Sequence, residues 1–237
     1  MSPVREITPP ARPPVTVELG YRSNASLLVA YATQLVKSEL TVKTELPVRP
    51  GTSIVLKLNA PAASIGLRGV VASTRADSGG NAQIAALEVT LTSSAESMGE
   101  AVDKLALGFS GITVLVAASQ AAPRAHLSRY LRAIVNCHVV EIDQSRLSDP
   151  GAIPNVDLVV IDLDSSGPAG YDVYAQLRQH PEVATAPVLA LAQAERDRLR
   201  AASLGFDEAL ANPPAFAELQ AATLRCLGKP SKVFVVS

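Results

Sequence analysis

The spacing of apolar residues changes once along this chain, near Gly108 and Gly111, and this change restricts the fold more than any other feature. Before it, short runs alternate between apolar and polar residues, which is typical of strands with one buried face. After it, continuous apolar runs alternate with segments of helical spacing, which is typical of a parallel sheet covered by helices. The 237 residues therefore predict two small domains.

The N-terminal half predicts a small antiparallel β-barrel or sandwich. Turn residues such as Pro50-Gly51 separate its alternating runs. We expect strands at Val15–Leu19, Leu40–Thr44, Ser53–Leu58, Leu67–Val71 and Ile84–Val89. A helix capped by Ser94 should follow and end at Leu107. Its apolar stripe would comprise Met98, Ala101, Val102 and Leu105.

The C-terminal half predicts a doubly wound, five-stranded parallel sheet. Its strands are expected at Ile112–Val116, Cys137–Ile142, Asp157–Leu163, Pro187–Leu191 and Asp207–Leu210. Helices are expected at Arg124–Val135, Tyr171–His180, Glu195–Leu204 and Phe216–Leu227. The predicted organisation is a flexible proline-rich arm (1–14), a barrel with its helix (15–109), an α/β domain (110–228) and a tail (229–237).

The tail contains an apolar segment that should not be left in water. Pro230 cannot continue the last helix, and Val233–Val236 is apolar and favours a strand. We expect this segment to pack as an added strand of the protein itself, or on the sheet edge of a partner. A mobile tail is the alternative.

Composition argues against several functions. Net charge is −1, so no overall field attracts nucleic acid or an anionic membrane, and no apolar run approaches the length of a membrane helix. Cys137 and Cys226 form no CxxC pair, which predicts buried, reduced thiols in a cytoplasmic protein. His126, His138 and His180 have no metal-ligand spacing, and no nucleotide-binding or hydrolase motif occurs. We expect no enzyme, metal or cofactor.

From Ile112 to about Gly228 the chain resembles the receiver domain of bacterial response regulators. The segments that carry the resemblance are Val156–Asp164, Gly170–Tyr174, Leu177–Gln179, Ala186–Val188 and Leu204–Asp207. Asp162 matches the aspartate that receives a phosphoryl group in that family. The family's acidic pair, hydroxyl and lysine fall on residues that lack those groups, which are Ala117, Ala118, Ala192 and Asn212.

The resemblance therefore implies a receiver without phosphorylation chemistry. Phosphoryl transfer depends on positioning and charge neutralisation, and Asp162 would have neither a metal cage nor a lysine. Asp162 is then a relic carboxylate or a structural hydrogen-bond acceptor. A metal site formed by Asp162 and Asp164 is a further alternative.

The N-terminal half resembles PilZ domains more loosely. The matching segments are Val15–Arg22, Thr33–Thr44, Pro47–Leu58, Leu67–Ser73 and Ala86–Thr90. Typical PilZ domains bind cyclic di-GMP with paired arginines and with a polar, glycine-containing strand segment. The corresponding positions here, the last three expected on a strand, are Thr8, Arg12, Gln34, Val36 and Glu39. They lack most of these groups, and we expect no tight nucleotide binding.

The loss of two chemistries predicts a protein that acts through its surfaces. The combination is similar to myxobacterial PilZ-like regulators of motility and polarity, which implies a cytoplasmic adaptor that a partner could recruit to a cell pole. The expected binding face comprises Glu195–Leu204, Leu210–Pro214 and Phe216–Leu227, with the tail Val233–Val236 as a second surface. A cyclic di-GMP effector with a non-standard site and an atypically phosphorylated regulator are the alternatives.

Overall fold

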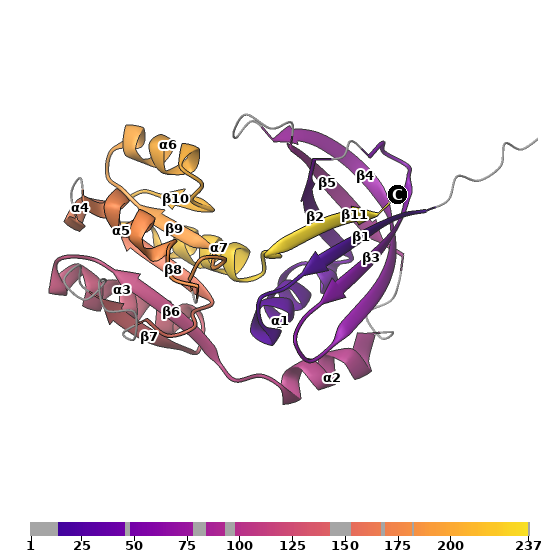
Figure 1. The fold of residues 1–237 in the computed structure, drawn as a ribbon, viewed down its shortest axis with the longest axis horizontal. Coiled ribbons are helices and arrows are strands. Elements are labelled where there is room, and N and C mark those ends of the chain that lie inside the picture. Colours follow the sequence, from indigo (N-terminus) through magenta and orange to yellow (C-terminus); the bar gives the residue numbers. More distant parts are fainter. Residues whose placement is uncertain are drawn as a thin grey trace, which may run out of the picture.

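The chain forms two units, each built on one sheet, that lie side by side (Figure 1). The structure is a computed structural model, and it describes residues 14–45, 48–77, 84–92, 98–142, 153–166, 169–181 and 183–236. The first unit has a six-stranded sheet and the second has a five-stranded sheet. The chain passes from the first unit to the second at 108–111 and returns at 228–231.

The sheet of the first unit contains both antiparallel and parallel pairs. Its strands are β1 (Val15–Gly20), β2 (Glu39–Thr44), β3 (Ser53–Asn59), β4 (Ser64–Asp77), β5 (Ile84–Leu91) and β11 (Lys232–Val236). Their order is β11-β1-β3-β4-β5-β2, and all neighbours are antiparallel except β1 and β3. The expected purely antiparallel arrangement is therefore wrong for this pair. The helical crossover after β1 and the placement of β2 at the far edge let β3 run beside β1 in the same direction.

The core of this unit follows the expected alternation. Leu40 and Val42 of β2 are buried, as are Ile54, Leu56 and Leu58 of β3. The sheet curls until its edge strands β11 and β2 approach one another, without a ladder between them among the described residues (Figure 1). A PilZ-like barrel thus remains an expectation from resemblance, whereas a curled sheet with an inner core is observed.

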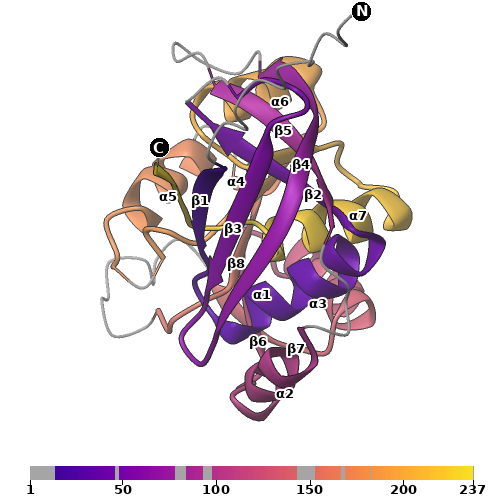
Figure 2. The same ribbon diagram turned by 90° about the vertical axis from the view of Figure 1, so that its right-hand side faces the viewer.

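Helix α2 (Gly99–Leu107) covers part of this core (Figure 2). Met98 and Leu105 are buried, and Ala101 and Val102 pack against the same cluster. The predicted apolar stripe is confirmed. The expected cap, Ser94, lies outside the described residues.

Helix α1 (Asn24–Thr33) was not predicted, and it lies where the two units meet (Figure 1). The Ser23 side chain caps it by accepting a hydrogen bond from the Ser26 N–H at 3.1 Å. Leu27 and Ala30 enter the core of the first unit, while Ala25 enters a core of the second. A helix that is apolar on two sides lacks the one-sided stripe by which helices are predicted.

The expected strand across 34–39 is wrong. Gln34 ends α1 with its N–H bonded to Ala30 O at 2.9 Å, and Leu35–Lys37 form a 3-10 turn. Ser38 has a φ of 58°, and β2 begins only at Glu39. The 3-10 turn therefore occupies the residues before β2, and the strand begins within one residue of the start that its alternation predicted.

The second unit is the predicted doubly wound sheet. Its parallel strands are β6 (Ile112–Ala117), β7 (Cys137–Ile142), β8 (Leu158–Asp162), β9 (Val188–Leu191) and β10 (Glu208–Leu210). The order is β10-β9-β8-β6-β7, the flavodoxin-like arrangement with the first strand inside. Its helices are α3 (Ala121–Ile134), α4 (Leu163–Ser166), α5 (Ala169–Leu177), α6 (Glu195–Ser203) and α7 (Phe216–Leu227). The short α4 was not predicted.

Each face of this sheet has its own core. Val114 and Val116 of β6 face α3 and α7, whose Leu131 and Leu219 lie in the same cluster. Leu115 belongs to the cluster on the other face, which includes residues of α5 and α6. Residues alternate between two buried faces, so the strands read as continuous apolar runs.

The C-terminal tail returns to the first unit as strand β11. It pairs antiparallel with β1, with Val235 opposite Val17 and Val233 opposite Leu19. Both valines pack against the core, whereas Phe234 is 58% exposed. The prediction that the tail forms an added strand of the protein itself is confirmed.

Candidate functional site

The carboxyl edge of the second sheet holds the residues singled out by the receiver resemblance. Asp162, at the end of β8, is only 2% exposed. Its Oδ1 accepts hydrogen bonds from the Asp164 N–H at 3.1 Å and from the Asn212 Nδ2 at 3.0 Å. The Asn212 Nδ2 also donates to Asp164 Oδ2 at 2.8 Å, and the Gln193 N–H donates to that same oxygen at 2.8 Å.

Asn212 therefore acts as a clamp between two carboxylates. One amide group spans Asp162 and Asp164, and the backbone of Gln193 completes the network. The arrangement ties together the ends of β8, β9 and β10. A hydrogen-bond donor lies between the two acids, where a cation binding both would need to lie, so the geometry favours the structural interpretation of Asp162. Among the described residues, no three His, Cys, Asp or Glu side chains gather into a metal-binding group.

The other positions singled out by the receiver resemblance hold buried alanines, and arginine side chains donate hydrogen bonds to backbone oxygens there. Ala117 and Ala118 are buried at the end of β6, and Arg124 Nη1 donates to Ala118 O at 2.7 Å. Arg198 Nη1 donates to Ala192 O at 3.0 Å and to Gln193 O at 2.8 Å. The guanidinium groups of Arg124 and Arg198 thus bind backbone oxygens that follow β6 and β9. The receiver resemblance places the family's acidic pair and hydroxyl at these same two strand ends.

The nucleotide positions inferred from the PilZ resemblance are only partly described. Thr8 and Arg12 lie outside the described residues. Gln34 is half-buried at the end of α1, Val36 is exposed on the 3-10 turn, and Glu39 is exposed at the start of β2. A backbone hydrogen bond of 3.3 Å from Glu39 N to Gln34 O closes this turn. These three residues form a compact turn rather than one face of a strand.

Replacement of Asp162 tests the structural role of this network. Asp162→Ala removes the oxygen that accepts from both the Asn212 amide and the Asp164 N–H, so we expect the free energy of unfolding to fall by about 1–3 kcal/mol. Urea unfolding measures this change. Asp162→Asn, which keeps one oxygen, should lose less, and Asp172→Ala on the exposed side of α5 should change it by under ~0.5 kcal/mol. In cells, the folded Asp162→Ala protein should keep its function. A loss that a phosphomimetic residue restores would contradict this.

A second polar site lies where the two units meet, at the opposite, amino edge of the sheet. A cleft of about 360 Å³ opens there, lined by residues of both units. Arg22 Nη1 donates to Thr185 Oγ1 at 2.7 Å, and its Nη2 donates to Asn155 Oδ1 at 2.5 Å. Ser23 Oγ donates to Asp157 Oδ1 at 2.6 Å, and the other Asp157 oxygen accepts from Thr113 N at 2.9 Å. The turn before α1 is thereby bonded to the second unit.

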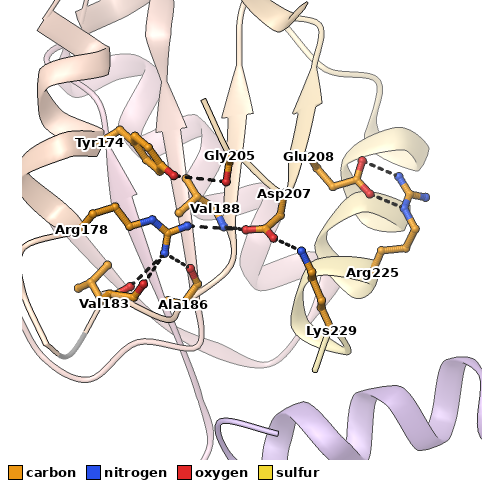
Figure 3. Close-up of polar contacts among 11 residues, drawn as sticks. Tyr174, Arg178, Val183, Ala186, Val188, Gly205, Asp207, Glu208, Arg225 and Lys229 are labelled. Carbon is orange, nitrogen blue, oxygen red and sulfur yellow. Dashed lines mark hydrogen bonds and ion pairs between the residues drawn. The ribbon is translucent and has the colours of Figure 1, made fainter. Parts of the chain in front are cut away.

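Asp207 is the centre of the cleft's charged groups (Figure 3). It accepts a hydrogen bond from Val188 N at 2.7 Å, forms an ion pair with Lys229 and lies 3.9 Å from Arg178 Nη2. Arg178 Nη1 also donates to Ala184 O at 2.9 Å and to Ala186 O at 2.8 Å. The ion pair with Lys229 therefore fixes the segment 228–231, where the chain returns to the first unit. The polar groups of the cleft are used in contacts within the fold, so the cleft is a structural junction between the two units.

The junction was not foreseen from the sequence. Its partners lie far apart in the chain, with Arg22 and Thr185 separated by 163 residues. No motif spacing marks such pairs, because their proximity depends on how the two units dock.

Helix α7 makes the largest correction to the expected binding face. Its C-terminal end lies against α1, where Ser26 Oγ donates to Leu227 O at 2.5 Å in a buried hydrogen bond. A Cβ placed on Gly228 would be 3.2 Å from Ala30 N. The C-terminal end of this face is thus covered by the protein's own helix. The exposed apolar residues of the expected face are Leu199 (65%) on α6, Leu204 just after α6, and Phe216 (42%) on α7.

The two thiols differ in exposure. Cys226 is buried on α7, as expected, and burial raises the pKa of its thiol. Cys137 is only half-buried on β7, although burial raises the pKa of this thiol also. Neither thiol is disulfide-bonded. In the part of the chain that is described, no helix has the length and apolarity needed to span a bilayer.

The strand order and the helices on both faces define the second unit as a doubly wound α/β domain of flavodoxin-like topology. No family model matches the chain, and no curated protein matches it. Similar solved structures include the receiver domain of the sensor histidine kinase PA1611 from Pseudomonas aeruginosa, at 21% identity and a TM-score of 0.44. That comparison covers 51% of this chain and 100% of the other.

Two further similar structures are also receiver domains. One belongs to a two-component histidine kinase of Clostridium thermocellum, at 18% identity and a TM-score of 0.44, and it covers 51% of this chain and 99% of the other. The other belongs to a DNA-binding response regulator of Colwellia psychrerythraea, at 18% identity and a TM-score of 0.42. It covers 47% of this chain and 94% of the other.

Proposed function

We propose that this protein is a non-enzymatic signalling adaptor that acts by binding other proteins, without phosphorylation and without cyclic di-GMP. The observation that supports this best is the Asn212 clamp. Its amide donates to both Asp162 and Asp164, so the position of a phosphoryl-accepting site is filled by an internal hydrogen-bond network. A phosphoryl group on Asp162 would have to break this network without a lysine to neutralise its charge.

The junction supports the same proposal. The first unit is bonded to the second by Ser23–Asp157 and Arg22–Thr185, and the chain crosses between them twice. A pair of units held in this way presents fixed surfaces to a partner. The exposed apolar residues Leu199 and Leu204 of α6 belong to the face expected to bind. The resemblance to motility and polarity regulators suggests the process, cytoplasmic location and polar recruitment.

Acetyl phosphate labelling tests the absence of phosphorylation. The purified protein, incubated with acetyl phosphate and Mg²⁺, should gain no mass of a phosphoryl group by intact mass spectrometry. A working receiver domain treated in parallel supplies the positive control. Labelling that is lost in Asp162→Asn would refute the adaptor proposal in favour of an atypically phosphorylated regulator.

Calorimetry tests the absence of nucleotide binding. We expect that titration with cyclic di-GMP shows no saturable heat that corresponds to a Kd below about 10 µM. A Kd of that size is a binding free energy of roughly −7 kcal/mol. The reasons are the hydrophobic Val36 and the acidic Glu39 at positions where the ligand's polar and phosphate groups would need donors. A saturable signal abolished by Arg12→Ala would instead support the cyclic di-GMP effector.

A further inference from the structure

Helix α3 carries a local positive charge that the net charge of the chain conceals. Its fourteen residues include Arg124, Arg129 and Arg132 and no aspartate or glutamate, whereas the whole chain has a net charge of −1. Arg124 is used within the fold, because it donates to Ala118 O and lies 3.9 Å from Glu141. Arg129 and Arg132 are exposed on the outer side of the helix.

An aromatic cluster lies beside Arg129, one turn before Arg132 on the same helix. The rings of His126 and Tyr130 have centroids 4.4 Å apart, and the ring of Phe216, at the start of α7, meets Tyr130 edge-on at 5.6 Å. Arg129 Nη2 lies 3.4 Å from His126 Nδ1, which places the guanidinium next to the rings. We name this surface the α3–α7 patch and define it as His126, Arg129, Tyr130, Arg132 and Phe216.

The α3–α7 patch differs from the rest of this chain in its composition. Aromatic residues make up only 4% of the sequence, yet Tyr130 and Phe216 meet at the surface, with Phe216 42% exposed. Arginine, tyrosine and other large aromatic residues are the types most enriched at the energetic centres of protein interfaces. The patch is also separate from the end of α7 that α1 covers, since Phe216 begins that helix and Leu227 ends it.

We propose that the α3–α7 patch binds a short acidic segment of a partner protein that also carries a large apolar side chain. Carboxylates would pair with Arg129 and Arg132, because guanidinium groups bind carboxylates in a bidentate manner. The apolar side chain would cover Tyr130 and Phe216. Glu218 lies two residues after Phe216, so the two side chains do not share one side of α7. This inference rests on the proposed adaptor function and names the chemistry of its partner.

A peptide-display selection on the intact protein tests this proposal. Random 16-residue peptides are selected, and the enriched sequences are synthesised with a fluorescein label and titrated by fluorescence polarisation. We expect enrichment of Asp and Glu together with Leu or Phe. Binding should weaken at least about tenfold in Arg129→Glu and in Phe216→Ser, which is the loss typical of a central interface residue. Arg49→Glu, at an exposed arginine in the turn before β3 of the first unit, is the matched control and should bind as the wild type does.

Several outcomes would overturn the proposal. These are enriched peptides without acidic residues, affinities unchanged by Arg129→Glu, or an equal loss with Arg49→Glu. Arg129-dependent binding of a DNA or RNA oligonucleotide, or of phosphatidylglycerol vesicles, in place of the peptides would assign the patch to another ligand class. Acetyl phosphate labelling of Asp162 would refute the adaptor function but not the peptide-binding role of the α3–α7 patch, because the labelling does not involve the residues of that patch.

Discussion

Deletion of Val233–Ser237 is expected to lower the free energy of unfolding by about 2–4 kcal/mol, because it removes two half-buried valines and the hydrogen bonds between β11 and β1. For a chain of this size the melting temperature should fall by about 5–15 °C. The deletion also uncovers Val17 and Leu19 and leaves β1 as a free sheet edge, so aggregation on heating should increase. Scanning calorimetry and light scattering measure both effects.

Single substitutions separate the packing role of β11 from a role in binding a partner. Val235→Asp places a charge against Val17 and should reproduce most of the destabilisation. Phe234→Ser changes the exposed side of the same strand and should shift stability by under ~0.5 kcal/mol. If the deletion leaves the melting temperature unchanged while Phe234→Ser abolishes capture of a partner, the tail serves the partner and our assignment is wrong.

The comparison of sequence and structure shows where pattern reasoning succeeds. The strands β6 and β8 were predicted because both their faces are buried, so their residues read as unbroken apolar runs. The strands β2 and β3 were predicted because only one face is buried, which gives strict alternation. In both cases the environment of each strand is fixed by its own sheet, and the local sequence reports it.

Pattern reasoning fails where two units share one element. Helix α1 supplies Leu27 to one core and Ala25 to the other, so its apolar residues do not form a single stripe. The parallel pairing of β1 with β3 follows from the path of the chain through this helix. At the candidate site, the receiver resemblance placed Asn212 at the family's lysine position. The clamp it forms with Asp162 and Asp164 depends on side-chain geometry that spacing alone does not give.

The contact between α1 and α7 is predicted to depend on the absence of a side chain at Gly228. A Cβ there would lie 3.2 Å from Ala30 N and 3.3 Å from Ala30 Cα, so Gly228→Ala forces α1 to move by a few tenths of an ångström. Gly228→Val adds two further carbon atoms and should cost about 1–3 kcal/mol by overpacking.

The loss should appear as a lower melting temperature and as faster hydrogen exchange of the α1 amides, because α1 is the element displaced. Gly99→Ala is the matched control, since a Cβ at Gly99, in the first turn of α2, meets no atom within 4 Å. It should be neutral or slightly stabilising. Equal behaviour of Gly228→Ala and Gly99→Ala would show that close packing at Gly228 does not hold the two units together. Faster exchange confined to α1 in the Gly228 variants would identify this contact as the one that fixes their relative position.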